Sequence, residues 1–156
     1  MVTVCLPCSA NCALCQSAAL CISCVAGFFM NSKQECGRGC PDRFYPSEQT
    51  FTCQKCPYDC LKCTHSGNCI SCNSSDLRVL FTNLSRCLPL PGFYDNGSRV
   101  SIPCPPSCKL CQSATYCISC VPGYFLNIDY TCLDSCPAHF YRDKVTLSCL
   151  RCPYDC

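Results

Sequence analysis

Large aromatic side chains recur along this chain as adjacent pairs, and the stretches between the pairs are polar or contain cysteine. Because neighbouring side chains of a strand point to opposite faces, one member of each pair is expected to cover a disulfide while the other faces outward. The pattern therefore predicts short β-strands. The pairs are Phe28-Phe29, Phe44-Tyr45, Phe93-Tyr94, Tyr124-Phe125 and Phe140-Tyr141.

Two segments between cysteines contain an aromatic strand, a polar centre and a return strand. They are residues 25–35, centred on Asn31-Ser32, and residues 121–131, centred on Asn127-Ile128. This pattern is typical of a β-hairpin, and the enclosing cysteines are spaced to close its base. The spacing predicts disulfides between Cys24 and Cys36 and between Cys120 and Cys132.

Two further segments, residues 41–52 and 137–148, have the same order of aromatic pair, polar centre and return strand. Their turns are expected near Ser47-Glu48 and Asp143-Lys144. Each full period of the chain is thus expected to hold two hairpin loops after one compact cysteine block.

That block has the form C-x3-C-x2-C-x5-C-x2-C and occurs at residues 8–24, 56–72 and 104–120. Equivalent positions recur every 48 residues without drift, and a fixed period of this length indicates a repeat architecture. The expected domains are repeats 1–52, 53–100 and 101–148, followed at 149–156 by the start of a fourth. Each period offers eight cysteine positions, which we number as slots one to eight; in the first repeat they are Cys5, Cys8, Cys12, Cys15, Cys21, Cys24, Cys36 and Cys40.

The second repeat lacks two neighbouring cysteines of this series. Its slot eight is missing, near Pro91, and the slot one that follows is Ser101. Loss of one partner of a disulfide leaves a reactive thiol, whereas loss of both leaves none. The joint loss predicts that slot eight bonds to the following slot one, so that Cys40 pairs with Cys53 and Cys136 with Cys149.

Composition agrees with a fold held together by disulfides. The chain has 25 cysteines in 156 residues and no tryptophan, which is typical of small secreted domains without a sizeable core. Ordering one residue costs about 1.5 kcal/mol, and one cross-link contributes about 2 to 4 kcal/mol, so reduction is expected to unfold the chain. We expect an extracellular or cell-surface location, reached by the secretory route.

Charge and hydropathy exclude several kinds of partner. The net charge is +2, and the twelve Lys and Arg residues are scattered among ten acids, so no basic run indicates nucleic acid or a membrane surface. No apolar run is long enough to span a membrane, and we expect no membrane insertion in these residues. The first residues, MVTVCLPC, lack the basic and apolar regions of a signal peptide, so a secretion signal and any anchor are expected outside this sequence.

The order of these motifs is similar to that of the furin-like repeat, also called the growth-factor-receptor cysteine-rich repeat. The resemblance rests on C-x2-C-x3-C-x2-C-x5-C-x2-C-x2-G-[FY]-[FY] followed by C-x3-C-P-x2-[FY]-[FY], and it covers essentially the whole chain. Such repeats occur in proprotein convertases, R-spondins, receptor ectodomains and long surface proteins of single-celled eukaryotes. The resemblance implies a small disulfide-rich fold of short β-hairpins stacked into an extended rod, with little or no helix.

The resemblance also implies a disulfide pairing: slot two with four, three with five, six with seven, and eight with the next slot one, as in R-spondins. Three cysteines then remain, namely Cys5, Cys152 and Cys156, and their partners are expected before residue 1 and after residue 156. If Met1 is the natural start, Cys5 is instead a candidate for an intermolecular disulfide. The implied pairs are Cys8 with Cys15, Cys12 with Cys21, Cys24 with Cys36, Cys40 with Cys53, Cys56 with Cys63, Cys60 with Cys69, Cys72 with Cys87, Cys104 with Cys111, Cys108 with Cys117, Cys120 with Cys132, and Cys136 with Cys149.

The stretch that departs from the family pattern, residues 73–103, holds every N-glycosylation sequon of the chain. The sequons begin at Asn73, Asn83 and Asn96. N-glycans are therefore expected here if the chain passes through a eukaryotic secretory route; the alternative is that Asn, Gly and Ser are simply loop residues. Because the first block resembles the third and the second resembles the fourth, a 96-residue pair is also a possible unit.

Catalysis, metal and cofactors are not expected. The C-x2-C pairs have the spacing of zinc sites, but zinc ligands are gained and lost in fours, whereas this chain loses a pair. His65 and His139 occupy different slots, so neither is a recurrent ligand or base, and no nucleophile and base recur together.

Two functions remain for comparison. The first is an extracellular structural repeat, a rigid glycosylated spacer or filament element whose partners are neighbouring repeats and lateral proteins in a fibre or coat. The alternative is a binding module of a receptor or secreted signalling protein, in which outward aromatic residues form a sticky ridge; packing of those residues against the adjacent repeat is the structural explanation. A cysteine-rich tail of a convertase is a third, and would require a protease domain elsewhere.

Overall fold

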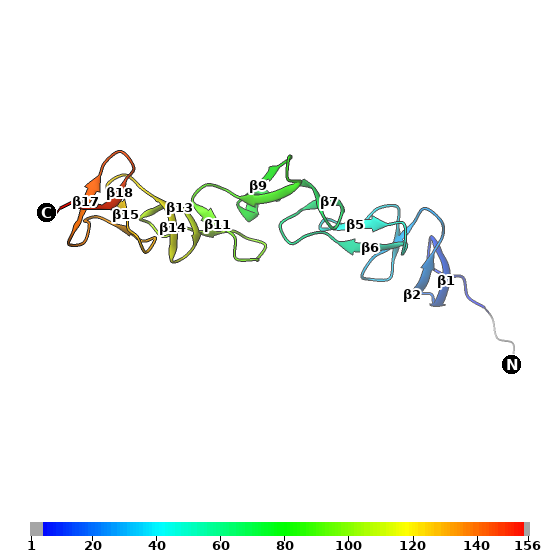
Figure 1. Ribbon diagram of the computed structural model, residues 1–156. Coiled ribbons are helices and arrows are strands. Elements are labelled where there is room, and N and C mark those ends of the chain that lie inside the picture. The colour runs from blue at the N-terminus through cyan, green and yellow to red at the C-terminus, as the bar shows by residue number, and fades with distance from the viewer. Residues whose placement is uncertain (1–4, 155–156) are drawn as a thin grey trace. The chain divides into compact units, whose positions relative to one another are not determined.

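The computed structural model describes residues 5–154 and is almost entirely β (Figure 1). Short strands form five two-stranded and two four-stranded sheets, and the only helical element within the described residues is one turn of 3₁₀ helix, η1 (Ser74–Asp76). The prediction of a small disulfide-rich fold of repeated β-hairpins is confirmed. None of the described residues forms a helix long and apolar enough to cross a membrane.

Each cysteine block folds into an antiparallel hairpin, a detail that the sequence pattern did not reveal. The hairpins of the first and third repeats share one register, in which Cys12 faces Cys24 and Cys108 faces Cys120. Both are irregular, with shifts of register along the strands. The strands of the three blocks are β1 (Cys12–Ser17) with β2 (Leu20–Cys24), β7 (Lys62–His65) with β8 (Asn68–Ser71), and β13 (Cys108–Ser113) with β14 (Tyr116–Cys120).

In the first and third repeats the two predicted hairpin loops join into one four-stranded sheet. The join is a single parallel pairing, Met30 with Thr52 in the first repeat and Leu126 with Ser148 in the third. The first sheet has the order β4-β3-β6-β5 and the other β16-β15-β18-β17. Their strands are β3 (Phe29–Met30), β4 (Cys36–Gly37), β5 (Phe44–Ser47), β6 (Thr52–Lys55), β15 (Phe125–Leu126), β16 (Cys132–Leu133), β17 (Phe140–Asp143) and β18 (Ser148–Arg151).

The second repeat differs, because its two hairpins remain separate two-stranded sheets. One is formed by β9 (Arg78–Phe81) and β10 (Arg86–Pro89), the other by β11 (Phe93–Tyr94) and β12 (Ile102–Pro103). The chain divides within the first of these hairpins into two compact units. One unit runs up to Asn73 and includes Leu80–Cys87, and the other contains Ser74–Val79 and the residues from Leu88 onward. The division of the sequence into 48-residue repeats stays a prediction.

The interior of both units is built from cystine sulfur. Apart from Phe125, every buried hydrophobic residue among those described is a cysteine, so the apolar contacts that stabilise this fold are largely contacts between disulfides and the strands beside them. The buried cysteines are Cys21, Cys60, Cys63, Cys69, Cys87, Cys108, Cys111, Cys117, Cys120 and Cys149.

Candidate functional site

Eleven disulfides connect the described residues, with Cα–Cα distances of 5.5–5.8 Å. These distances fall in the usual range for disulfides. The structure pairs the same cysteines as the furin-like resemblance implies, slot by slot. Among them are the slot-eight bonds Cys40–Cys53 and Cys136–Cys149, which the joint loss in the second repeat had indicated independently.

One expectation about the remaining cysteines is wrong. Cys152 is disulfide-bonded within this chain, whereas the family pairing placed its partner after residue 156. Cys5 is exposed and has no disulfide, and Cys156 lies outside the described residues.

Disulfides also pack against one another at a recurring place. The slot-five sulfur lies close to the slot-seven sulfur: Cys21 Sγ is 3.4 Å from Cys36 Sγ, and Cys69 Sγ is 3.7 Å from Cys87 Sγ. The block is thereby fixed to the hairpin that follows it. Three sulfur-containing clusters have the spacing of metal ligands, but their sulfurs belong to disulfides and lack the thiolate that binds zinc.

Backbone hydrogen bonds identify which residues of the second repeat stand at the two missing cysteine positions. Phe44 N–H and Phe140 N–H donate to the residue that follows slot eight, Pro41 and Pro137. The equivalent bond runs from Phe93 N–H to the carbonyl of Leu90, so slot eight is Pro89, two residues before the position near Pro91 that the sequence indicated.

Ser101 is confirmed as the vacant slot one by a second bond of the same kind. Three residues after slot one, an N–H donates back across the hairpin: Cys56 to Arg43, and Cys152 to His139. In the second repeat the corresponding bond joins Cys104 N–H to the carbonyl of Gly92, at 2.8 Å. Ser101 is as buried as the equivalent cysteine of the next repeat, at 2% exposure compared with 3% for Cys149.

A buried arginine occupies the region where the disulfide is missing. Arg78 begins β9 directly after a turn bond from Leu77 N–H to Ser74; the same turn precedes Phe125 in β15. The Arg78 side chain is fully buried, and its guanidinium donates two hydrogen bonds to the carboxylate of Asp95, at 3.0 and 3.1 Å. Arginine thus stands where the other repeats have an aromatic residue.

The same guanidinium also holds the hairpin loop. Its Nε donates to the carbonyl of Arg99, and Nη2 donates to the carbonyl of Ser98, both at 2.9 Å. Beside it, Arg99 forms an ion pair with the buried Asp76 at 3.5 Å, and Ser101 N–H donates to the Asp76 carbonyl. Polar contacts from residues 76–78 therefore fasten the 93–103 hairpin, and we call this set of contacts the Arg78 joint.

A second buried carboxylate belongs to the other unit. Asp59 is fully buried and accepts hydrogen bonds from Arg86 Nε, at 3.1 Å, and from the Cys87 N–H, at 3.2 Å. The Asp59 carboxylate raises the pKa of Arg86. This pair ties the second cysteine block to strand β10, so the second repeat has a second buried ion pair that sequence analysis did not identify.

The three sequons differ in exposure. Asn83, in the turn between β9 and β10, and Asn96, in the loop held by Arg78, are exposed, whereas Asn73 is half-buried. The Asn96 carboxamide oxygen accepts hydrogen bonds from the N–H and hydroxyl of Ser98, at 3.0 and 2.6 Å. Two of the three predicted glycosylation positions therefore stand open to solvent.

In the first two repeats, the second aromatic residue of the hairpin that precedes the next cysteine block packs against that block. Tyr45 packs against the buried cysteine cluster of the second block, and Tyr94 packs against that of the third. At the first of these junctions Arg43 N–H also donates to the Leu61 carbonyl, at 2.6 Å. These two tyrosines therefore pack against the next block, and they do not form an outward aromatic surface for a partner.

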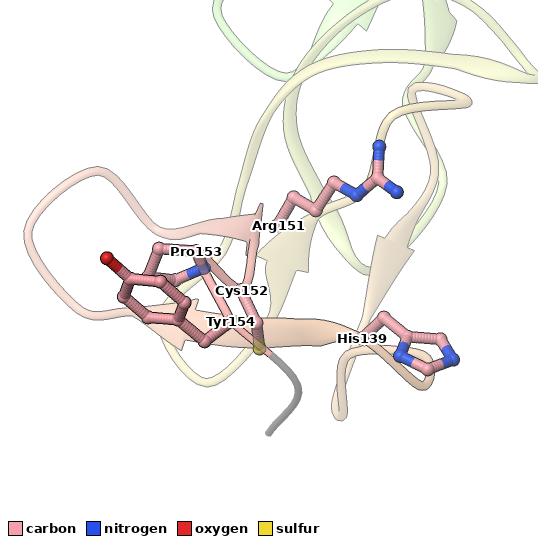
Figure 2. A pocket seen from close by; sticks show the side chains of 5 residues that line it. All are labelled: His139, Arg151, Cys152, Pro153 and Tyr154. Carbon is pink, nitrogen blue, oxygen red and sulfur yellow. The ribbon is translucent and has the colours of Figure 1, made fainter.

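The equivalent tyrosine of the third repeat, Tyr141, is 46% exposed. Near it lies an open pocket of about 700 Å³, lined by His139, Arg151, Cys152, Pro153 and Tyr154. In Figure 2 the rings of Tyr154 and His139 lie on opposite sides of Cys152. His139, the counterpart of Arg43, is a lining residue here, while His65 ends strand β7 and accepts a hydrogen bond from Gly67 N–H.

Each unit has a small apolar cleft, and the two clefts lie at positions 96 residues apart. The first is about 170 Å³ and contains Ile22, Met30 and Phe51; the second is about 260 Å³ and contains Ile118, Leu126 and Leu147. Ile22 and Ile118 are 56% and 54% exposed. The clefts agree with the 96-residue unit that the blocks suggested, and sequence analysis did not identify them.

No family model matches this sequence, and no curated protein matches it. The furin-like resemblance therefore rests on its own motifs. What the fold itself shows is a cysteine-rich protein of repeated β-hairpins, whose many disulfides place it in the oxidising surroundings of extracellular modules.

Proposed function

We propose that this chain is part of an extracellular structural array, a rigid, disulfide-stapled and glycosylated spacer or filament element of a cell-surface or appendage protein. The observation that carries the proposal is the recurring junction in which Tyr45 and Tyr94 each pack on the disulfide cluster of the following block. Repeats that contact only their neighbours form a linear solid whose length follows their number. Its partners are further repeats and lateral proteins of a fibre or coat, and it has no catalytic role.

The end of the second unit supports a further repeat in the same register. Residues 152–156 have the sequence CPYDC, identical to residues 56–60, which open the second block. Tyr141 is exposed where Tyr45 is packed. A following block would cover Tyr141 and the pocket beside it.

Extending the chain tests this proposal directly. A copy of residues 61–87 is appended after Cys156, and hydrogen exchange is measured at residues 140–151. We expect slower exchange and a protected Tyr141, because the new block supplies the contacts that Tyr45 makes in the first junction. Electron microscopy should show a particle that lengthens by a constant step with each added repeat.

The matched control is the same extension with its four cysteines changed to serine, which cannot form the block. Equal exchange in both extended chains, or a compact particle whose length does not grow, would contradict the array. Changing Tyr141→Ala in the extended chain should remove most of the added protection.

Glycosylation of this element is proposed at Asn83 and Asn96, because both are exposed. Expression through a eukaryotic secretory route, followed by enzymatic glycan removal, should lower the mass of the chain by two glycans. Asn83→Gln and Asn96→Gln should each remove one of them. An unchanged mass after glycan removal would contradict the proposal.

A binding module is the second candidate, and the paired apolar clefts favour it. Exposed apolar surface with a concave shape is typical of interaction sites, and Phe51 and Leu147 keep large side chains there despite positive φ angles of 52° and 51°. Ile22→Lys or Ile118→Lys should weaken binding of an apolar fluorescent dye. Ile70→Lys, which changes the equivalent exposed isoleucine of the second block, is the control; equal effects of all three changes would rule out the clefts.

A further inference from the structure

Two tyrosines of the third repeat are stacked on each other. Tyr116 opens β14, and Tyr130 lies in the turn between β15 and β16. Their ring centroids are 4.1 Å apart, with an angle of 19° between the ring planes. The equivalent residues are Asn68 and Ser85 in the second repeat, where the same backbone bond joins Cys69 N–H to the Ser85 carbonyl, so the stack is a property of the third repeat.

The backbone fixes the distance between these rings. Cys117 N–H donates to the Tyr130 carbonyl at 2.8 Å, and Tyr130 N–H donates to the Asn127 carbonyl at 3.0 Å. The disulfides Cys108–Cys117 and Cys120–Cys132 anchor the chain next to each tyrosine. Tyr130 has a φ of 63°, and its counterparts Gln34 and Ser85 have φ angles of 61° and 51°, so the turn itself sets the backbone that carries this ring.

Both phenols are accessible to solvent. Tyr130 is 45% exposed and Tyr116 is half-buried. A hydrogen bond to Tyr130 raises the pKa of Tyr116. An oxidant in solution can therefore reach a pair of phenols whose rings are already stacked.

We infer that Tyr116 and Tyr130 are a site of oxidative cross-linking, at which a peroxidase with hydrogen peroxide joins the two rings as dityrosine. Each phenol gives up one hydrogen atom, and the two phenoxyl radicals couple through a carbon–carbon bond between ring positions next to the hydroxyls. The ring protons at those positions move to the oxygens and restore both aromatic rings. Two tyrosines and one hydrogen peroxide give one dityrosine and two waters.

The cross-link would have a defined mechanical effect. It joins the third block to the turn of the β15–β16 hairpin, in parallel with the existing disulfides, and a carbon–carbon bond resists thiol reductants. The inference depends on the stacked geometry and on the presence of an extracellular oxidant, and it does not require the array proposed above.

The test treats the folded, disulfide-bonded chain with a haem peroxidase and hydrogen peroxide at low protein concentration. The expected product is a monomer that shows dityrosine fluorescence, has lost the mass of two hydrogen atoms, and yields a linked peptide containing Tyr116 and Tyr130 after reduction and digestion. Tyr116→Phe and Tyr130→Phe keep a ring in the stack but remove one phenol, and each should abolish the intrachain product. Tyr124→Phe, which changes an exposed tyrosine outside the stack, should leave the yield unchanged.

Three outcomes would overturn the inference. They are no dityrosine, dityrosine mainly between chains with a yield that rises with protein concentration, and an intrachain product that persists in Tyr116→Phe. The variants are compared at equal hydrogen-exchange protection of β14, so that loss of folding is not mistaken for loss of the site.

Discussion

The hairpin at residues 44–55 and the hairpin at residues 93–103 share a backbone plan but are fastened by different chemistry. In both, the aromatic pair faces the return strand, and an N–H after slot one donates back across the hairpin. The disulfide Cys40–Cys53 closes the first, whereas the Arg78 joint holds the second. A repeat array can therefore keep its geometry while exchanging a covalent bond for a buried ion pair.

The two fastenings act on different states of the chain. A disulfide restricts the unfolded chain and contributes about 3 kcal/mol for a loop of this size. A buried ion pair acts only in the folded state, where desolvation offsets much of its attraction. Removing one partner is then costly because the other charge is left without compensation.

The largest effect is expected from Arg78→Ala, which leaves the carboxylate of Asp95 without its guanidinium. We expect a loss of about 3 kcal/mol in local stability, at the lower end for a broken buried pair, because Asp95 keeps 29% exposure. Hydrogen exchange at residues 93–103 measures it. Lys62→Ala is the control, since it breaks an exposed pair with Asp42 and should cost under about 1 kcal/mol; similar losses in both variants would show that the Arg78 joint is unimportant.

Removing the covalent counterpart should have a slightly smaller effect. The double change Cys40→Ser with Cys53→Ser leaves no free thiol and should lower stability by about 2–3 kcal/mol. The loss should appear as faster exchange in strands β5 and β6, measured with the 140–151 hairpin as internal reference. Unchanged exchange there would mean that the four-stranded sheet holds this hairpin without its disulfide.

Restoring the missing disulfide sharpens the comparison further. The double change Pro89→Cys with Ser101→Cys should form one additional disulfide on oxidation and raise stability by about 2 kcal/mol. Loss of two hydrogen atoms in the mass, without alkylation by a thiol reagent, shows that the bond has formed. Pro91→Cys with Ser101→Cys is the matched variant and should stay reduced. If a disulfide forms only in the Pro91→Cys, Ser101→Cys variant, then slot eight lies at Pro91 and not at Pro89.

The smallest effect concerns the turns of the third repeat. The hydroxyl of Thr146 and the N–H of Val145 donate to Asp143 and lower its pKa. A carboxylate with a lowered pKa stabilises the fold above its ordinary pKa, near 3.9, and this stabilisation is lost as the pH falls through the lower folded value. Exchange at the 140–151 turn should therefore be constant from neutral pH to about 4 and rise below it, after correction for intrinsic rates. Asp143→Asn keeps an acceptor for the turn and should remove that rise.

The chain's own spacing and repeats predict the disulfides that close the hairpins of the first and third repeats, whereas the pairings within the cysteine blocks were implied by the furin-like resemblance. The spacing of Cys24 and Cys36, and the joint absence at slot eight and Ser101, point to bonds that the structure also contains. The four-stranded sheets did not follow, since each depends on one parallel pairing, such as Met30 with Thr52, that leaves no periodic signal. The hairpins within the blocks were hidden by their irregular register.

The Arg78 joint was missed for a different reason. The partners of the Arg78 guanidinium lie 17 to 21 residues along the chain, and an isolated arginine normally lies at the surface. The available signal was that Arg78 stands at the position of Phe125, but the different spacing of the preceding turn shifts it out of the 48-residue register. The missing slot-eight position was expected near Pro91 and lies at Pro89 because the longer spacing in the second repeat also shifts it out of register.

The Arg78 joint also bears on how the chain reaches its native pairing during oxidation. Wrong partners multiply quickly with cysteine number: six cysteines allow roughly 15 connectivities and eight allow roughly 105. The hairpin at residues 93–103 contains no cysteine, so it adds no wrong partner to that search. The cysteine-free stretch 88–103 therefore separates the cysteines of the second block and its hairpin from those of the third block along the chain.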